Sequence, residues 1–282
     1  MSSTLDPRLS TYGSTTFIGG GNMSRSLIGA LIGHGADAAT LAVAEPRAEA
    51  RDELARDFGV RTFADNADAV AGAGCVVLAV KPQMMRGVCE RLAEPLRETR
   101  PLLISIAAGV RIEQLERWLG AHLAIVRCMP NTPALIGAGA AGLCANARVG
   151  AAQRALAERI LNAAGIARWI EDESHMDVVT ALSGSGPAYF FLLAEMMEDA
   201  AVELGLPRAT ARALAVQTCL GAGRMLAEGN ESAATLRARV TSPQGTTQAA
   251  LDAFAQGNLR ELVRRAMTAA TRRGGELSAM LD

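Results

Sequence analysis

The first half of the chain alternates short apolar runs with longer segments of helical periodicity. The runs are four to six residues long and rich in Val, Ile and Leu, as in parallel strands that are buried on both faces. They lie at Thr15–Ile18, Leu41–Ala44, Val60–Phe63, Cys75–Val80, Leu102–Ile106 and Leu123–Arg127. Helices are expected between them, at about Pro46–Phe58, from Pro82 onward and at Arg111–Leu119. This alternation predicts an α/β fold, a doubly wound, Rossmann-like parallel sheet with ligands at the carboxyl ends of its strands.

The second half of the chain has no strand signal after about Glu173 and is predicted to be all-α. Helices are expected at Ser174–Leu182, Pro187–Leu204, Arg208–Ala227, Thr247–Gln256 and Leu259–Leu281. They are apolar over a wide arc, and Ala213–Gly223 contains no charged residue. A helix that is apolar nearly all round must be buried, yet this part of the chain is too short to bury several such helices alone. We therefore expect a homodimer with interleaved C-terminal helices, which could associate further into a higher oligomer.

A glycine-rich turn follows the first apolar run. Thr15–Ile18 leads into Gly19-Gly20-Gly21, and a helix-compatible segment begins at Asn22. Strand, glycine turn and helix N-terminus form a geometry that binds a pyrophosphate, because unpaired N–H groups and the positive end of the helix dipole point at the anion. Ser24 stands where the usual motif has its third glycine. The turn predicts a dinucleotide site, and a plain strand-to-helix connection is the alternative.

Composition and charge narrow the class of protein. The 282 residues are 50 % hydrophobic and carry a net charge of −1, so we expect a real core and neither nucleic acid nor an anionic membrane as partner. No apolar run approaches the roughly 18 residues that a membrane helix needs. The polar residues 1–13 are interpreted as a disordered leader, not a signal peptide. The five cysteines are widely spaced without a C-x-x-C pair, which predicts no metal site and a cytoplasmic location.

Lys81 is the only lysine among the 28 basic residues. Arginine is used wherever else a cation stands, so a single ammonium suggests that a guanidinium does not fit at this position. Chance is the alternative.

Six segments resemble, in their order and spacing, those of one enzyme family. They are FIGGGNM (17–23), AVKPQ (79–83), SIAAG (105–109), RCMPNTPALIGAG (127–139), VTALSGSGPAYFF (179–191) and SPQGTT (242–247). The chain resembles pyrroline-5-carboxylate reductase over roughly residues 14–281. The resemblance implies NAD(P)H-dependent reduction of a cyclic imine, 1-pyrroline-5-carboxylate, to L-proline, the last step of proline biosynthesis.

The resemblance also implies which residues bind the cofactor. The pyrophosphate would be held by Ile18, Gly19, Gly20, Gly21, Asn22 and Met23. Asn66 would contact the adenosine side, and Val80, Lys81 and Pro82 would border the ribose and the nicotinamide. Ala107 and Ala108 would line the nicotinamide pocket, with Asn131 near the carboxamide. For Asn131, a simple turn residue is the alternative.

The substrate site is expected at two further segments. The resemblance assigns the substrate carboxylate to Gly245, Thr246 and Thr247, and to the helix start after Ser183, Gly184, Ser185 and Gly186. The N–H groups of Gly245 and Thr246 would form a small nest for the carboxylate. A cyclic imine is basic enough that no dedicated strong acid is required. Thr247 is the catalytic candidate that would hydrogen-bond the ring nitrogen, with Lys81 as a second. In this family the loop and the nucleotide domain of one site come from different subunits.

Structural alternatives remain for these segments. Thr247 could simply cap the helix that starts there, because Thr is a good N-cap. Ser183–Gly186 could be a flexible connector between helices.

Two departures from the family pattern affect the site. The family loop commonly reads Ser-Pro-Gly-Gly, and Gln244 replaces its first glycine here, so Gln244 must tolerate that backbone angle. Glu45 ends the second strand, where an acidic residue usually accepts the ribose 2′-OH and favours NADH. Arg47 follows two residues later and could bind the 2′-phosphate of NADPH. We predict NADPH as cofactor, with NADH also used.

Two other classes of protein compete with an imine reductase. Another imine reductase or a β-hydroxyacid-type dehydrogenase would be expected to place a catalytic lysine on a helix of the second domain, and this chain has no lysine besides Lys81. A non-enzymatic nucleotide or pyridoxal-phosphate binding protein would not need the loops at 183–187 and 242–247, and Lys81 would be its only Schiff-base anchor. We predict a leader (1–13), a dinucleotide-binding domain (14–172) and a helical dimerisation and substrate-binding domain (173–282).

Overall fold

The computed structural model describes residues 13–120 and 123–281, and the chain divides into two compact units. The first unit extends to Gly184 and includes the chain again from Ala270 onward, whereas the second comprises Ser185–Ala269. The predicted leader, except Gly13, lies outside the described residues.

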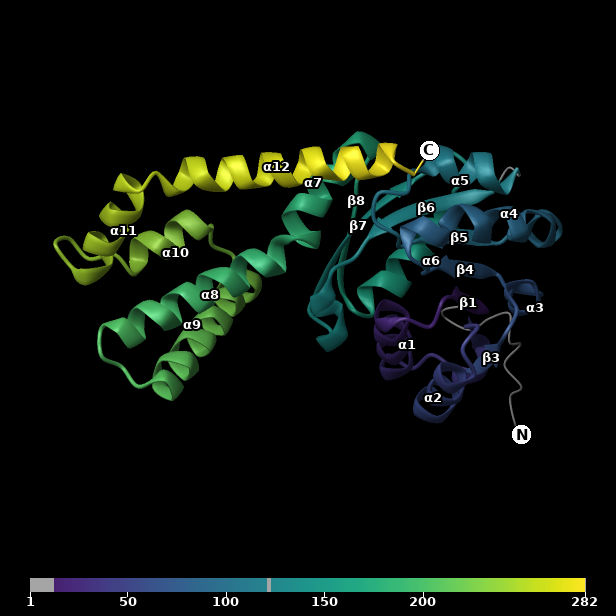
Figure 1. Ribbon diagram of the computed structural model, residues 1–282, viewed down its shortest axis with the longest axis horizontal. Helices are drawn as coiled ribbons and strands as arrows, with labels where there is room; N and C mark the ends of the chain where they lie inside the picture. The colour runs from purple at the N-terminus through teal and green to yellow at the C-terminus, as the bar shows by residue number, and fades with distance from the viewer. Residues whose placement is uncertain (1–12, 121–122, 282) are drawn as a thin grey trace. The chain divides into compact units, whose positions relative to one another are not determined.

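Eight strands of the first unit form one sheet in the order β3-β2-β1-β4-β5-β6-β7-β8 (Figure 1). Their bounds are β1 (Thr15–Ile18), β2 (Leu41–Ala44), β3 (Arg61–Phe63), β4 (Cys75–Leu78), β5 (Leu102–Ser105), β6 (Ala124–Met129), β7 (Gly139–Ala145) and β8 (Gly165–Trp169). All neighbours pair in parallel except β6 and β7, which are antiparallel. The order 3-2-1-4-5-6 is that of dinucleotide-binding sheets, so the predicted doubly wound fold is confirmed. The antiparallel pair corrects the expectation of a wholly parallel sheet.

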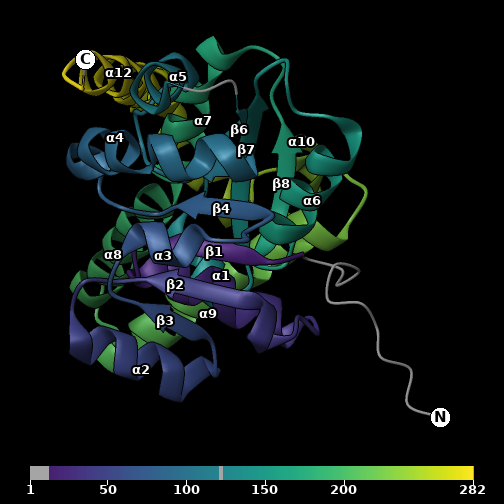
Figure 2. The same cartoon turned by 90° about the vertical axis from the view of Figure 1, so that its right-hand side faces the viewer.

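Helices cover both faces of this sheet (Figure 2). One hydrophobic cluster packs α1 (Asn22–Gly33), α2 (Ala48–Phe58) and α6 (Ala151–Asn162) against one face. The other packs α3 (Asn66–Val70), α4 (Pro82–Thr99) and α5 (Ile112–Leu119) against the opposite face. Short turns complete the unit: η2 (Ala38–Thr40), η3 (Thr132–Ile136), η4 (Glu173–His175), α7 (Met176–Val179) and η5 (Thr180–Gly184). Because neighbouring residues of β4 and β5 belong to different clusters, these two strands are largely apolar and buried on both faces, as the sequence indicates.

The elements between residues 139 and 169 have no clear signal in the sequence. Strand β7 reads GAAGLCA, and Gly and Ala are poor strand formers. Its glycines are required by packing: a Cβ on Gly139 would lie 2.8 Å from the Ala164 carbonyl oxygen, and one on Gly142 would lie 2.6 Å from Val179. The close approach of neighbouring segments, and not strand propensity, explains this sequence.

The second unit is helical, as predicted. It contains α8 (Gly186–Glu203), α9 (Arg208–Glu228), α10 (Ala233–Arg239), α11 (Thr246–Gln256) and the first part of α12 (Leu259–Ala279). Its large apolar side chains are exposed, with Phe191 67 % and Leu214 56 % accessible. Within the described part of the chain, neither hydrophobic cluster includes a residue of this unit. These helices therefore leave an apolar surface to be covered. Among the described helices, none has the length and apolar character that crossing a membrane requires.

Candidate functional site

The glycine turn after β1 has the shape of a phosphate cradle. Gly19 has φ +102°, and a Cβ there would lie 2.9 Å from the Ala79 carbonyl oxygen, so only glycine fits. A Cβ on Gly21 would meet open space, which leaves room for a ligand. Gly21 is the N-cap of α1 and has no side chain to cap it, so the first N–H groups of the helix, at Asn22 and Met23, remain for an anion. These residues fit the pyrophosphate of a dinucleotide.

Ser24 stabilises this turn from within the first helix. Its buried hydroxyl donates to the Gly19 carbonyl oxygen at 2.6 Å. The glycine that the usual motif has at this position could not make this bond. The serine therefore helps to fix the shape of the turn and is still small enough for the available space.

Glu45 follows β2 and joins the same turn. Its carboxylate is only 7 % exposed, and Oε2 accepts the N–H of Gly20 at 3.1 Å. Oε1 accepts both the backbone N–H of Arg47, at 3.2 Å, and the Arg47 Nε–H, at 2.9 Å. Burial alone would raise the pKa of Glu45, but the hydrogen bonds from Arg47 and Gly20 outweigh it and hold that pKa below its usual value. Both oxygens of the predicted ribose acceptor are therefore already engaged.

Arg47 is the N-cap residue of α2 and its side chain is largely exposed. The bond to Glu45 holds one edge of the guanidinium, and the Glu45 carboxylate raises the pKa of Arg47 above its ordinary value. The arrangement presents a fixed cation beside the glycine turn, where a second phosphate could bind.

The strand ends of β4 and β5 carry the next candidates. Val80 lies against the glycine turn, since its Cγ1 is 3.2 Å from a Cβ built on Gly19. The exposed Lys81 is the N-cap residue of α4, and Pro82 is the first residue of that helix, as predicted. After β5, Ala107 is buried and Ala108 is exposed.

Asn131 connects three segments that follow β6. Its side-chain Nδ2 donates to the Ser183 carbonyl oxygen at 2.9 Å, and its Oδ1 accepts the N–H of Ala140 at 2.9 Å. Asn131 is buried, so both bonds form away from bulk water. The residue is thus more than a turn former: it links β7 to the turn Thr180–Gly184. Contact with a carboxamide stays a prediction.

The sheet topology brings the cofactor candidates to one edge. Strands β1, β2, β4, β5 and β6 are parallel and in register, so the residues that follow them share the carboxyl edge. Asn66, the first residue of α3, follows β3 at the same edge. This is the position at which open α/β sheets bind ligands.

The segment before α8 has an unusual backbone. Residues Thr180–Gly184 form a π-helical turn where the sequence predicts the end of a regular helix, and such turns are frequent at functional sites. Ser183 and Gly184 end this turn, and Gly184 permits a close approach because a Cβ there would lie 2.6 Å from Met129. Ser185 is the N-cap residue of α8, and Gly186 is its first residue.

The loop at 242–247 corrects two expectations. Helix α11 begins at Thr246 with Gly245 as N-cap, so Thr247 is not a cap residue. The Gly245 N–H donates to the Ser242 carbonyl oxygen at 3.1 Å and is thus not available to a carboxylate. The first N–H groups of α11, at Thr246 and Thr247, point out of the helix start, as in helix termini that can bind an anion. Gln244 adopts φ +61°, the left-handed angle that the missing glycine demands.

The buried thiols do not add nucleophiles to the site. Burial raises the pKa of Cys75 and of Cys89 to about 12, and it raises the pKa of Cys128 and of Cys144 as well. All four thiols remain protonated at neutral pH.

Two family models match the chain. The model for pyrroline-5-carboxylate reductase dimerisation matches residues 173–277, which include every helix of the second unit. The model for NADP oxidoreductase, coenzyme F420-dependent, matches residues 14–109, which include the glycine turn. The first match supports a homo-oligomer.

Relatives of known family match nearly the whole chain. Pyrroline-5-carboxylate reductase from Pseudomonas aeruginosa is 51 % identical over 94 % of this chain and 97 % of its own length. The solved structure of a pyrroline-5-carboxylate reductase from Coxiella burnetii is 46 % identical and superposes with a TM-score of 0.92, covering 95 % of this chain and 99 % of that one. The Plasmodium falciparum pyrroline carboxylate reductase, solved with NADP bound, is 29 % identical with a TM-score of 0.82, covering 94 % and 98 %. The glycine cradle, the helical second unit and these likenesses together show that the chain belongs to the pyrroline-5-carboxylate reductase family.

Proposed function

We propose that this chain uses NADPH, and also NADH, to reduce 1-pyrroline-5-carboxylate to L-proline, the last step of proline biosynthesis. The observation that carries the proposal is the phosphate cradle at Gly19–Met23, in a chain whose relatives are named for this reaction. The cofactor supplies the hydride when it is bound. The protein must orient the imine, neutralise its carboxylate and hold the ring nitrogen.

The cofactor residues divide by strand end. The N–H groups at the start of α1 bind the pyrophosphate, with Gly19–Gly21 shaping the turn. Arg47, fixed by Glu45, pairs with the 2′-phosphate. Asn66 borders the adenosine, Val80–Pro82 border the ribose, and Ala107, Ala108 and Asn131 surround the nicotinamide.

The substrate carboxylate is bound by helix N-termini. The uncapped N–H groups of α11, at Thr246 and Thr247, offer a positive dipole end without adding a charged side chain. The segment Ser183–Gly186 provides a second such start at α8. The Thr247 hydroxyl holds the ring nitrogen of an imine that water can protonate, and Lys81 is the other candidate to touch the reacting groups. Positioning of this kind can contribute on the order of 7–11 kcal/mol.

The oligomer is proposed to be a homodimer that can associate further. The support is the exposed apolar surface of α8 and α9 together with the matched dimerisation model. The dimer would bring the 242–247 loop of one protomer to the nucleotide-binding domain of its partner. We also propose a cytoplasmic location and a functional division into 14–172 and 173–282, which differs from the two compact units because 173–184 and 270–281 pack with the first. Light scattering on a chromatographed sample that gave a stable monomer would contradict the dimer.

Initial rates of NADPH and NADH oxidation with 1-pyrroline-5-carboxylate test the function. We expect rapid turnover with a higher kcat/KM for NADPH. Absence of turnover with both cofactors, in protein shown to be folded and oligomeric, would reject the proposed reaction.

A further inference from the structure

The last turn of α12 packs against the loop that follows β5. Gly109 in this loop has φ +77°, and a Cβ built on it would lie 3.5 Å from Ser278 Oγ and 3.6 Å from Ser278 N. Leu281 is 3.8 Å from the same point and packs against the cluster that contains Ala107. The loop Ala107–Gly109 is therefore supported from behind by residues 278–281, all within the first unit.

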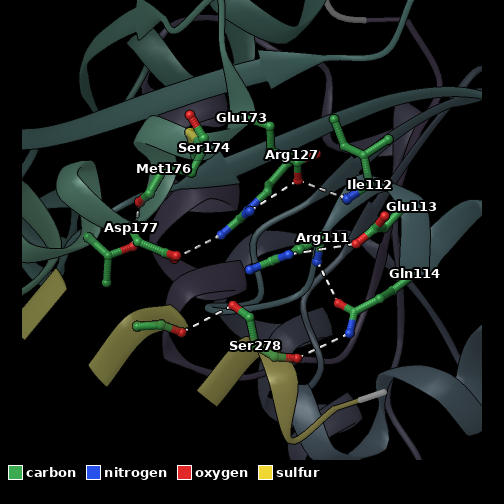
Figure 3. A network of polar contacts seen from close by, with 12 residues as sticks. Arg111, Ile112, Glu113, Gln114, Arg127, Glu173, Ser174, Met176, Asp177 and Ser278 are labelled. Carbon is green, nitrogen blue, oxygen red and sulfur yellow. Dashed lines mark hydrogen bonds and ion pairs between the residues drawn. The ribbon is translucent and has the colours of Figure 1, made fainter. Parts of the chain in front are cut away.

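Gln114 ties this turn to the start of α5. Its Nε2 donates to the Ser278 carbonyl oxygen at 3.2 Å, and its Oε1 accepts the N–H of Arg111 at 2.8 Å (Figure 3). Gln114 is wholly buried and Ser278 nearly so. Capping of α5 needs only the Oε1 contact, as Gln153 shows by accepting the Gly150 N–H at 3.0 Å from the same position of α6. The Nε2 contact is an additional link between segments 164 residues apart.

A buried arginine, Arg127, contributes a second set of contacts at the start of α5, through Glu173. Arg127 is 4 % exposed and pairs with Glu173 at 3.0 Å and Asp177 at 3.6 Å. Glu173 Oε1 also accepts the N–H of Ile112 at 2.9 Å (Figure 3). The cluster thus connects β6, the start of α5 and α7. A buried charge that is paired and hydrogen-bonded in this way resists displacement, because removing one partner leaves the other charge buried and unpaired.

Asp177 meets α12 at a pair of glycines. A Cβ on Gly274 would lie 3.2 Å from Asp177 Oδ1, and one on Gly275 would lie 3.6 Å from Oδ2. Glycine inside a helix costs about 1 kcal/mol relative to alanine. Two in succession at the contact with Asp177 indicate that close approach is needed at this point. The end of α12 is therefore fixed both at 274–275 and at Ser278.

We propose that Gln114 and the terminal turn of α12 position the loop Ala107–Gly109 against the nicotinamide. This inference rests on the proposed function, which places that loop beside the nicotinamide ring. Hydride transfer depends steeply on geometry, and a displacement of about 1 Å can lower a rate by about 10²-fold. Gln114 and Ser278 act through the loop and are positioning residues.

The test separates the two ends of the cofactor. Binding of NADP⁺ and of adenosine 2′,5′-bisphosphate, which lacks the nicotinamide, is measured by calorimetry in Gln114→Glu. The carboxylate retains an acceptor for the Arg111 N–H but cannot donate to the Ser278 carbonyl. We expect about tenfold weaker binding of NADP⁺ at pH 8, about 1.4 kcal/mol, and unchanged binding of the fragment. At pH 6 the introduced carboxyl, buried and protonated, can donate again, so the loss should shrink.

Gln153→Glu is the matched control, because it makes the same change at a helix cap that lacks the second contact among the described residues. It should leave the affinity for both ligands unaltered. Equal weakening of NADP⁺ and fragment in Gln114→Glu, or no weakening of either, would overturn the proposal. Failure of the unmodified protein to bind NADP⁺ would instead reject the proposed cofactor site, and this inference with it.

A second variant guards against misfolding of Gln114→Glu. Ser278→Val adds bulk towards Gly109, whereas Ser278→Ala removes only the hydroxyl and keeps the carbonyl. We expect Ser278→Val to lower kcat and NADP⁺ affinity about tenfold with fragment affinity unchanged. Ser278→Ala should change these values by less than about twofold. If Ser278→Val and Ser278→Ala had the same kcat and the same affinities for NADP⁺ and for the fragment, the positioning role would be contradicted.

Discussion

The Nε–H of Arg47 donates to Glu45 Oε1 at 2.9 Å, so the acidic residue at the end of β2 fixes a cation instead of facing a ribose freely. The other carboxylate oxygen accepts the Gly20 N–H at 3.1 Å. Sequence position alone would assign Glu45 to the 2′-OH of NADH. The observed pair favours NADPH, because the guanidinium is held beside the turn and three of the acceptor positions of the carboxylate are already used.

Arg47→Ala should reverse this preference. It removes the cation for the 2′-phosphate and the Nε–H bond to Glu45 Oε1, which then keeps only the backbone N–H of residue 47 and can also accept a ribose hydroxyl. Hydrogen bonds to charged groups contribute about 1.5–3 kcal/mol, so the ratio of kcat/KM for NADPH to that for NADH should fall about 10- to 100-fold. Arg86→Ala, which breaks an exposed ion pair with Glu90, is the control. An unchanged ratio in Arg47→Ala would exclude Arg47 from the phosphate site.

The Glu45 carboxylate should stabilise the fold only above acidic pH. Its pKa is lowered in the folded state, because the bonds from Arg47 and Gly20 outweigh burial. Such a group contributes stability that is fully present above the unfolded pKa, about 4.3, and is lost as pH falls through the lower folded pKa. Urea midpoints of Glu45→Gln and the parent should differ at pH 7, and the difference should shrink as pH falls below the unfolded pKa of about 4.3. A difference as large in acid as at neutrality would contradict this linkage, and Glu90→Gln serves as the exposed control.

Thr247→Val should impair the reaction while Thr247→Ser retains it. The valine has the shape of threonine without the hydroxyl that is proposed to hold the ring nitrogen. Loss of one charge-assisted hydrogen bond predicts a fall in kcat/KM of about 10- to 100-fold. Thr99→Val, at the exposed end of α4, controls for the substitution itself. If Thr247→Val kept the parent kcat/KM, the hydroxyl would have no part in the mechanism.

Asn131→Asp should loosen the substrate segment. The new carboxylate keeps an acceptor for the Ala140 N–H but faces the Ser183 carbonyl without a proton to donate. Leaving a buried carbonyl unpaired costs about 1–3 kcal/mol, and we expect lower stability together with a higher KM for the imine. In the control Asn162→Asp, the carboxylate can still accept the Ala167 N–H, at 2.7 Å in the parent, so stability should change little. A normal KM in Asn131→Asp would separate Asn131 from substrate binding.

Gly165→Ala should be among the most destabilising single changes in the sheet. Gly165 has φ +148°, and a Cβ there would lie 2.0 Å from the Gly139 carbonyl oxygen. Such a clash in a conformation that favours glycine should lower the free energy of unfolding by about 3–5 kcal/mol, seen as a large drop in apparent Tm. In contrast, Gly87→Ala inside α4 meets only ordinary contact and should stabilise slightly. Equal Tm values for the two variants would contradict this account.

The predictable part of the fold is the part in which local sequence and packing agree. Strands β4 and β5 are continuous apolar runs, and the glycine turn sits where a strand meets a helix, so both could be identified. Strand β7 could not be identified, because its glycines are required by close contact with the Ala164 carbonyl and with Val179, which are distant in sequence.

The same distinction applies to the candidate site. Glu45, Arg47 and Lys81 follow strand ends and could be selected from position alone. The contact between Glu45 and Arg47, the engagement of the Gly245 N–H by Ser242 and the bond from Gln114 to Ser278 have no sequence signal. These depend on backbone geometry and on packing across up to 164 residues.

Lys81 gives the chain a single site for lysine-specific chemistry, because it is the only lysine in the sequence. The exposed residue at the start of α4 carries the only ε-amine in the chain, beside the strand end where the ribose is proposed to bind. Acylation of lysine side chains is therefore confined to one peptide. A ligand that covers this position shields that peptide, so the acylated fraction measured by mass spectrometry reports occupancy directly. The chain thus carries its own footprinting site, with no engineered label.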